Sequence, residues 1–516
     1  MPELPHQPRA ASRAVAFRAP LQGFELGVSS SGYQFEGGYN GTAQPQNNWA
    51  EWEALSHHDV VGDGARGWDL HHEDLERCRA LGLTTLRLSV EWARVQPSTS
   101  RERFAQAPAF DTVAIASYAA RIKAAQDAGL EVVVALCHFT YPRWLGLDFW
   151  TEPDAPQRFA AYVEAMLPLL QGALKELGAR PVLRYFTLTE PNATPIASYL
   201  AAALPSALTG AAKLAALMPA FDGMFASHVL AYAALRRVHD ELGLAPPTTT
   251  YASYLLDAWV ADRQFADVLA CRAKGVDPSD DRRLAAYLES SRRAHDKALE
   301  PLVAGNRASI PRRAFGTMLQ QAAEAIVAPS RLPRLRAALA RSPWAVPLDL
   351  MAVDYYDPYL AHQTRLPGEG LYEPWDWAVR PEGLYHCLKS YASLGLPLLV
   401  AENGMAVRRH VGKPADPRPD GIRRDDFIRA HVYEVLRART DGVNVIGYLH
   451  WSLTDNYEWG RFAPRFGLYG VDYDDPARRR LDTDAAGVDA ASAYGAIARA
   501  VRSGDREALA RALGGT

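Results

Sequence analysis

Eight short apolar segments alternate with longer amphipathic segments along most of the 516-residue chain. Alternation of strand and helix patterns predicts a parallel sheet with helices packed against it. Eight such units favour a (β/α)8 barrel, and a doubly wound open sheet is the structural alternative. The expected strands are Phe24–Ser29, Thr84–Val90, Val132–His138, Arg184–Thr189, Thr248–Leu255, Leu350–Tyr355, Leu398–Ala401 and Val445–His450.

Domain organisation follows from the same pattern. Amphipathic runs predict helices at Leu70–Leu81, Thr112–Gly129 and Gln157–Leu177, with a final helix around Ala490–Val501. No linker divides the chain, so we expect a single domain over residues 1–516 with a core of about residues 24–501. Residues 262–347, rich in Ala, Arg and Leu, are expected to insert extra helices between strands five and six. Residues 1–20 and 504–516 are expected to be peripheral.

The bulk composition excludes several classes of partner. The formal net charge is −3, which gives no electrostatic basis for binding nucleic acid or an acidic membrane surface. No apolar run reaches the length of a signal peptide or a membrane span. The four cysteines are far apart without a C-x-x-C pair, which predicts free thiols and a cytoplasmic location. We expect a small-molecule substrate, and a homo-oligomer is left open.

Polar and aromatic residues gather where the expected strands end. In parallel barrels, the rim at the strand carboxyl ends carries the catalytic groups. Any one of these residues is also explained as a buried, satisfied polar group, but seven at equivalent positions favour an active site there. They are Arg87, His138, Glu190, Tyr355, Tyr356, Glu402 and Trp451.

Two glutamates are the strongest chemical signal. Glu190 in "TLTEPN" follows strand four and Glu402 in "VAENGM" follows strand seven, nearly opposite in an eight-stranded barrel. A facing pair suits glycoside hydrolysis, and a separation of about 5–5.5 Å between carboxyl groups predicts retention of anomeric configuration. We expect Arg87 to keep Glu402 ionised and Tyr356 to donate a hydrogen bond to it. Glu190, without such a partner, is expected to have a raised pKa. Structural salt bridges are the alternative.

Motifs along the chain, from Phe24 to Tyr473, resemble glycoside hydrolase family 1, the retaining β-glycosidases on (β/α)8 barrels. They are "FELGVSSSGYQFEGG", "LRLSVEWARVQP", "CHFTYPRWL", "TLTEPN", "VDYYDPY", "VAENGM" and "GYLHWSLTDNYEWGRFAPRFGLYGVDY". The last wording also resembles the archaeal β-glycosidase branch. The resemblance implies Glu190 as acid/base, Glu402 as nucleophile, Arg87 and Tyr356 as support for the nucleophile, and Gln34, His138, Thr189, Trp451, Glu458 and Trp459 as substrate-binding residues. It implies no cofactor and no metal.

Three residues depart from the family pattern next to these motifs. Thr189 precedes the acid/base position where the family usually has Asn, an amide that helps to hold the sugar 2-hydroxyl. Asp354 precedes the paired tyrosines where Asn is usual, and Ala401 precedes the nucleophile position where Thr is usual. Thr189 therefore predicts a weaker grip on the 2-hydroxyl, whereas both glutamates are kept.

Other functions are weighed against this one. "GDGARG" at Gly62–Gly67 matches a dinucleotide-binding pattern, but it follows a poor strand. The adjacent histidine pairs at 57–58 and 71–72 lack metal-site spacing. A 6-phospho-β-glycosidase is disfavoured because Glu458 would repel phosphate. A non-catalytic or transglycosylating sugar-binding barrel is the remaining alternative, and it would be favoured by loss of a catalytic glutamate.

Overall fold

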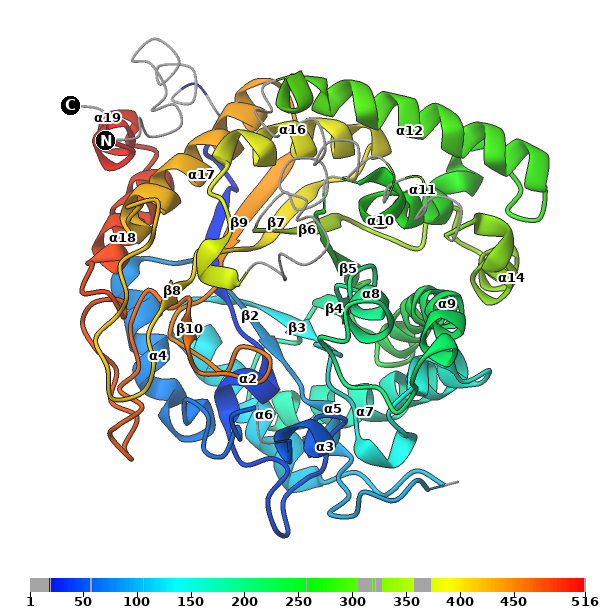
Figure 1. The fold of residues 1–516 in the computed structure, drawn as a ribbon, viewed down its shortest axis with the longest axis horizontal. Coiled ribbons are helices and arrows are strands. Elements are labelled where there is room, and N and C mark those ends of the chain that lie inside the picture. Colours follow the sequence, from blue (N-terminus) through cyan, green and yellow to red (C-terminus); the bar gives the residue numbers. More distant parts are fainter. Residues whose placement is uncertain are drawn as a thin grey trace.

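The computed structural model contains a closed barrel of eight parallel strands. It describes residues 18, 20–55, 58–104, 106–256, 258–304, 318, 321, 327–356 and 373–514. Each strand is hydrogen-bonded to its neighbours in chain order, and the last closes on the first (Figure 1). The (β/α)8 fold predicted from the sequence is therefore confirmed. The strands are β1 (Glu25–Ser29), β2 (Thr85–Ser89), β3 (Glu131–Ala135), β4 (Arg184–Thr189), β5 (Thr248–Tyr254), β6 (Met351–Tyr355), β7 (Leu398–Asn403) and β9 (Val445–His450).

Helices surround the barrel and cover its outer face (Figure 1). All four helices expected from the sequence are present, as α4 (Gly67–Leu81), α6 (Thr112–Asp127), α7 (Ala155–Glu176) and α18 (Ala490–Ser503). Asp111 and Asp489 accept hydrogen bonds from the first-turn amides of α6 and α18, which explains where those two helices begin. Around the barrel lie α2 (Gly32–Glu36), α3 (Ala50–Glu53), α4 (Gly67–Leu81), α5 (Trp92–Val95), α6 (Thr112–Asp127), α7 (Ala155–Glu176), α8 (Thr194–Tyr199), α9 (Ala211–Glu241), α16 (Pro381–Tyr391), α17 (Arg424–Thr440), α18 (Ala490–Ser503) and α19 (Arg506–Ala512).

The segment between β5 and β6 carries additional helices at the positions expected for the insertion. They are α10 (Trp259–Asp262), α11 (Gln264–Ala270), α12 (Asp281–Ala304) and α14 (Pro333–Arg341). Much of the rest of the insertion, and residues 1–17 of the N-terminal segment, lie outside the described residues. A two-stranded antiparallel sheet of β8 (Val407–Arg408) and β10 (Pro464–Arg465) lies apart from the barrel strands.

Two apolar clusters show which way the strand residues point. One cluster fills the barrel interior and includes Phe186, Leu399 and Ala401. The other lies between strands and helices and includes Leu188 and Val400. Strict alternation along a strand would put residues of one parity on one face. The β4–β5 and β6–β7 pairings depart from strict alternation, because each pair of strands has a register shift near the carboxyl ends of its strands.

The four cysteines and the longest apolar helix, α9, are largely buried within the protein. All four cysteines are buried and unpaired, as the spacing predicted. Helix α9 is long and apolar enough to cross a membrane by length and composition, but 78% of its most apolar window is buried within the protein. That burial is expected of a helix whose apolar side chains pack inside the protein.

Candidate active site

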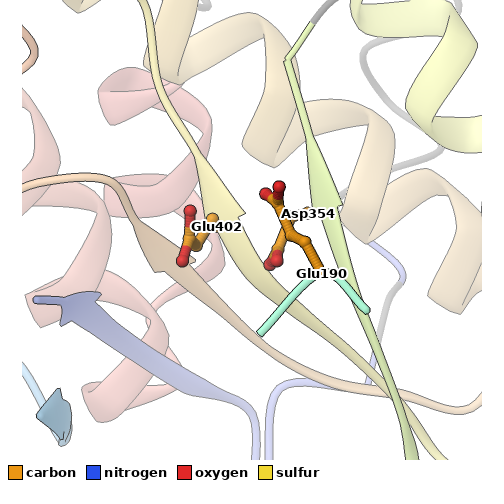
Figure 2. Close-up of side chains that lie close together, drawn as sticks. All are labelled: Glu190, Asp354 and Glu402. Atoms are coloured by element: carbon orange, nitrogen blue, oxygen red, sulfur yellow. The ribbon is translucent and has the colours of Figure 1, made fainter. Parts of the chain in front are cut away.

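Three carboxyl groups meet at the rim formed by the strand carboxyl ends. Glu190 follows β4, Asp354 lies in β6 and Glu402 lies in β7, and one oxygen of each is within 4.8 Å of the other two. Figure 2 shows the three side chains converging from separate strands. All three are nearly inaccessible to solvent, with Glu190 the most exposed at 9%. Three buried carboxyl groups with Arg87 as their nearby cation cannot all be ionised without a large electrostatic cost.

Glu402 is held on both of its carboxylate oxygens. The Arg87 guanidinium donates to Oε1, and the Tyr356 hydroxyl donates to Oε2 at 2.6 Å. Arg87 reaches the rim from β2 and is fully buried, lying over the ring of Phe186 in the barrel interior. An ion pair and a hydrogen bond both favour the ionised form, so this arrangement presents Glu402 as a carboxylate of fixed orientation.

Glu190 has a different environment. Burial and the nearby charge of Glu402 raise its pKa well above the ordinary value for a glutamate, although Arg87 acts in the opposite direction. Its backbone has φ +48°, a left-handed conformation at the point where β4 ends and the chain turns into α8. The two glutamates therefore have different surroundings: Glu402 is paired with Arg87 and Tyr356, whereas the raised pKa of Glu190 favours its protonated form. Such a pair supports acid and nucleophile roles at one site.

Asp354 was singled out in the sequence only as a departure from a family motif. Among the described residues, neither of its carboxyl oxygens has a hydrogen-bond partner, and the side chain is fully buried. Burial, followed by the charge of Glu402, raises its pKa well above the usual range. The signal that could have located it is its position one residue before the Tyr355–Tyr356 pair, at the end of an apolar strand.

The Asp354 carboxyl should make stability depend on pH. Because its pKa is raised on folding, the native protein keeps a proton that the unfolded chain loses above about pH 4, so stability falls as pH rises through neutrality. Asp354→Asn removes that dependence. In urea unfolding between pH 5 and 8, the stability of the variant relative to wild type should increase with pH. The increase should reach up to about tenfold in the unfolding equilibrium constant per pH unit.

A matched control for this experiment is Asp240→Asn, at an exposed position near the end of α9. Its stability relative to wild type should be the same at every pH tested. A constant difference for Asp354→Asn as well would contradict a proton held on Asp354.

Beside the glutamates, Glu458 forms a polar cluster with Trp451 and Gln34. The Trp451 indole donates to Glu458 Oε1 at 3.0 Å, and Gln34 Nε2 donates to Oε2 at 3.3 Å and to Asn456 at 3.0 Å. Burial raises the Glu458 pKa to about 8, although hydrogen bonds from Trp451 and Asn456 oppose the shift. A raised pKa favours the protonated form of Glu458 in the unliganded site.

His138 lies between two tryptophans in the same region. Its ring stacks on Trp451 at 5.7 Å and on Trp459 at 5.9 Å between ring centres. Burial, with the charge of Arg87, lowers the His138 pKa well below its ordinary value, so the ring is neutral. It follows β3, which ends at Ala135 rather than at His138 as expected. A neutral imidazole beside flat indole faces can hydrogen-bond a hydroxyl while apolar C–H groups pack on the rings.

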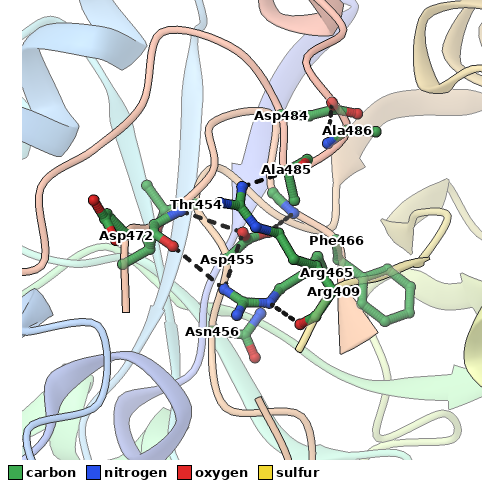
Figure 3. A network of polar contacts seen from close by, with 12 residues as sticks. Arg409, Thr454, Asp455, Asn456, Arg465, Phe466, Asp472, Asp484, Ala485 and Ala486 are labelled. Atoms are coloured by element: carbon green, nitrogen blue, oxygen red, sulfur yellow. Dashed lines mark hydrogen bonds and ion pairs between the residues drawn. The ribbon is translucent and has the colours of Figure 1, made fainter. Parts of the chain in front are cut away.

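The long loop after β9 carries Trp451, Glu458 and Trp459, and a buried polar network fixes it (Figure 3). Asp455 accepts hydrogen bonds from the backbone amides of Gly467 at 3.0 Å and Val471 at 3.2 Å, and it pairs with Arg465 at 3.4 Å. Satisfied buried groups of this kind are costly to break. The loop is therefore a rigid support for the residues that face the site.

A cavity of about 680 Å³ opens over these groups. Seven of the ten residues predicted from the sequence line it: Glu190, Glu402, His138, Tyr356, Trp451, Glu458 and Trp459. The other three, Arg87, Gln34 and Thr189, are at most 1% exposed and lie behind the lining side chains. The Thr189 hydroxyl is buried and has no hydrogen-bond partner among the described residues, and its role in substrate binding stays a prediction.

The comparison with known proteins agrees with this geometry. The model of the glycosyl hydrolase family 1 matches residues 18–258 and 353–488, so both glutamates lie in matched regions and the insertion at residues 262–347 lies outside them. A β-galactosidase from Sulfolobus acidocaldarius is 25% identical over 88% of this chain and 91% of that protein. A bifunctional β-D-glucosidase/β-D-fucosidase from Bifidobacterium breve is 26% identical over 90% of this chain and 96% of that protein.

Solved structures give the same fold. A family 1 β-glucosidase from Thermotoga maritima superimposes with a TM-score of 0.66 at 18% identity, covering 94% of this chain and 98% of that one. A β-glycosidase from Pyrococcus horikoshii gives a TM-score of 0.59 at 22% identity, covering 94% and 95%. With the family match over most of its length and the glutamate pair at the barrel rim, the chain belongs to glycosyl hydrolase family 1 and is a glycoside hydrolase.

Proposed function

We propose that this protein is a retaining β-glycosidase that hydrolyses terminal β-linked, unphosphorylated sugars of the glucoside, galactoside or fucoside class. The observation that carries the proposal is the asymmetric glutamate pair: Glu402 is held on both oxygens by Arg87 and Tyr356, and Glu190 within 4.8 Å has a raised pKa. Oxygens of the two groups within 4.8 Å of each other place the pair nearer the roughly 5–5.5 Å of retaining enzymes than the about 6.5–9.5 Å that inverting enzymes need to admit water.

The first chemical step joins the sugar to the protein. A Glu402 oxygen forms a bond to the anomeric carbon as the bond to the leaving oxygen breaks, and the Glu190 proton moves to that oxygen. Arg87 and Tyr356 keep Glu402 oriented for attack. The raised pKa of Glu190 means that its proton is present at neutral pH, when a leaving alkoxide needs it.

The second step releases the sugar. Water loses a proton to the Glu190 carboxylate as its oxygen bonds to the anomeric carbon, and the bond to Glu402 breaks. Both glutamates then return to their starting protonation states. Two displacements on opposite faces of the anomeric carbon give net retention of configuration.

The sugar itself is proposed to lie against the polar end of the cavity. His138 and Glu458 supply hydrogen-bonding groups there, and Trp451 and Trp459 supply flat faces. Gln34 orients Glu458 from behind. Sugar hydroxyls that donate to Glu458 favour its ionised form, so binding is expected to strengthen as pH rises toward the pKa of about 8. Cytoplasmic location and homo-oligomerisation stay predictions.

Retention is tested directly by following hydrolysis of nitrophenyl β-glycosides by NMR. The panel should contain the glucoside, the galactoside, the fucoside and a 6-phospho-glucoside, with Glu402→Gln as the inactive control. The first-formed sugar is expected to be the β anomer. Initial appearance of the α anomer would overturn the double displacement. Faster cleavage of the phosphorylated substrate would favour a 6-phospho-β-glycosidase, and no cleavage of any member would favour a non-catalytic barrel.

A further inference from the structure

A second cavity, of about 100 Å³, lies on the outer side of the barrel wall and shares no lining residue with the active-site cavity. Leu86 and Leu88 line it from β2, where they pack toward the layer between strands and helices. From the helices, it is lined by Leu75 and Cys78 of α4 and by Arg121 of α6. We call it the outer cavity.

The outer cavity exists because the outer face of β2 is incompletely covered. In the neighbouring strands β1 and β3, every residue after the first is buried, whereas Leu86 and Leu88 of β2 are only half-buried. Helix α4 presents four side chains to the cavity at helical spacing: His71, Asp74, Leu75 and Cys78. Of these four, Leu75 alone is large and apolar, so the two leucines keep accessible apolar surface. An apolar group that covers this surface gains binding free energy.

The size of the outer cavity sets the size of that group. An apolar cavity of about 150 Å³ accommodates a benzene molecule. The outer cavity, at about 100 Å³, therefore holds a ring or a chain of roughly four to six carbons.

Arg121 is a cation at the outer cavity without a carboxylate partner. Its guanidinium donates to the backbone carbonyls of Trp68 and Ser117 and lies 3.4 Å from the centre of the Trp68 ring. Its Nε is buried without a hydrogen-bond partner, and no carboxylate among the described residues forms an ion pair with it. Burial lowers the pKa of Arg121, as expected for a desolvated cation, although the charge of Glu36 opposes the shift.

The carboxylates that line the outer cavity are paired with other cations. Glu36 forms an ion pair with Arg94 at 2.9 Å, and Asp74 forms one with Arg480 at 2.9 Å. These two pairs balance each other's charge, which leaves Arg121 as the uncompensated charge of the lining. A ligand that brings a negative charge to Arg121 therefore gains a charge-assisted hydrogen bond at a partly buried position.

We propose that the outer cavity binds a small carboxylic acid with an apolar body of about four to six carbons, aromatic or aliphatic. The carboxylate pairs with Arg121, and the apolar body covers Leu86 and Leu88. Such a ligand contacts the strand that carries Arg87 between these two leucines, but it contacts none of the residues that line the active-site cavity. This site does not depend on the proposed function.

Benzoate is the probe, and its binding to the full-length protein is measured by isothermal titration calorimetry. The dissociation constant is expected to lie below about 1 mM. Benzamide has the same shape without the charge, and acetate has the charge without the ring. Each should bind at least about tenfold more weakly than benzoate, because each lacks one of the two interactions.

Variants locate the binding. Leu88→Phe in β2 and Cys78→Leu in α4 fill the outer cavity from opposite sides, and each should weaken benzoate binding by at least about tenfold. Two filling variants on separate elements keep the test valid if one does not fold, which thermal unfolding will show. The matched control is Val113→Phe, on α6, which is 75% exposed and outside the lining. It should keep the wild-type dissociation constant.

The charge is tested in the same way. Arg121→Gln should weaken benzoate by at least about tenfold and leave benzamide nearly unchanged. Its control is Arg79→Gln, at an exposed position of α4 outside the lining, which should bind benzoate as the wild type does.

Three results would overturn the proposal. The first is the absence of saturable benzoate binding up to about 10 mM. The second is an unchanged dissociation constant in the folded filling variants, which would place the ligand elsewhere. The third is equal binding of benzoate and benzamide, which would remove the carboxylate from the recognised group. Glycoside hydrolysis is measured separately and can succeed or fail independently of all three.

Discussion

Replacing Glu402 with glycine is expected to lower kcat by at least about 10⁴-fold, because no other described residue presents an ionised, fixed oxygen to the anomeric carbon. Arg87 and Tyr356 would then face an empty space where the carboxylate was. A small anion such as azide fits that space, carries the charge that Arg87 requires and attacks from the same face. Activity should therefore return with azide, and the product should be the α-glycosyl azide.

The measurement is kcat on a nitrophenyl β-glycoside with and without azide, followed by NMR of the product. Glu402→Gln is the control, since its amide fills the space and should prevent rescue. A Glu402→Gly enzyme that keeps more than about a tenth of wild-type kcat without azide would contradict the role of Glu402 as nucleophile.

Replacing Glu190 with alanine is expected to affect substrates according to their leaving groups. Alkyl glycosides need the proton, so their kcat/KM should fall by about 10²–10⁴-fold. Dinitrophenyl glycosides leave as stable anions, and their first step should be nearly unchanged. Wild-type kcat/KM should fall as pH rises through the raised pKa of Glu190, because the proton donor is then lost. This alkaline decline should be absent when the variant is assayed with the activated substrate.

Parallel measurements on Glu402→Gln and Glu190→Ala, with both substrates, distinguish the two roles. Equal losses on alkyl and dinitrophenyl glycosides in Glu190→Ala would reassign the proton donor. Mild losses in both variants would support a barrel that binds sugars without cleaving them.

The fold was predictable because several barrel strands, such as β3, β6 and β7, are buried on both sides and consist largely of apolar residues. The glutamate pair was predictable for a related reason: a carboxyl group at the end of such a segment stands out. Strand β7 runs two residues beyond its predicted end, through Glu402 to Asn403, because polar residues at a rim can still pair with neighbouring strands. Local patterns therefore identified the elements but set their ends imprecisely.

Properties that depend on three-dimensional surroundings were not predictable. The pKa of Glu458, about 8, comes from burial that no local pattern reports. Asp354 pairs with Glu402 across β6 and β7 at a shifted register, which the residue types do not reveal.

The register shifts at the rim have a consequence for how this barrel can change over time. Val353 of β6 pairs with Val400 of β7, and the next residue of β6, Asp354, pairs with Glu402. Ala401 is therefore the extra residue in β7. Ala401 belongs to the interior cluster, yet the carboxyl of the next residue also meets its neighbours at the barrel mouth. An irregularity of this kind lets consecutive side chains share a side. Because of the shift, the side chains at the barrel mouth need not follow the strict alternation that packs the barrel interior. Substitutions at the barrel mouth, above the shift, can therefore change substrate specificity while the packing of the barrel below the shift is kept.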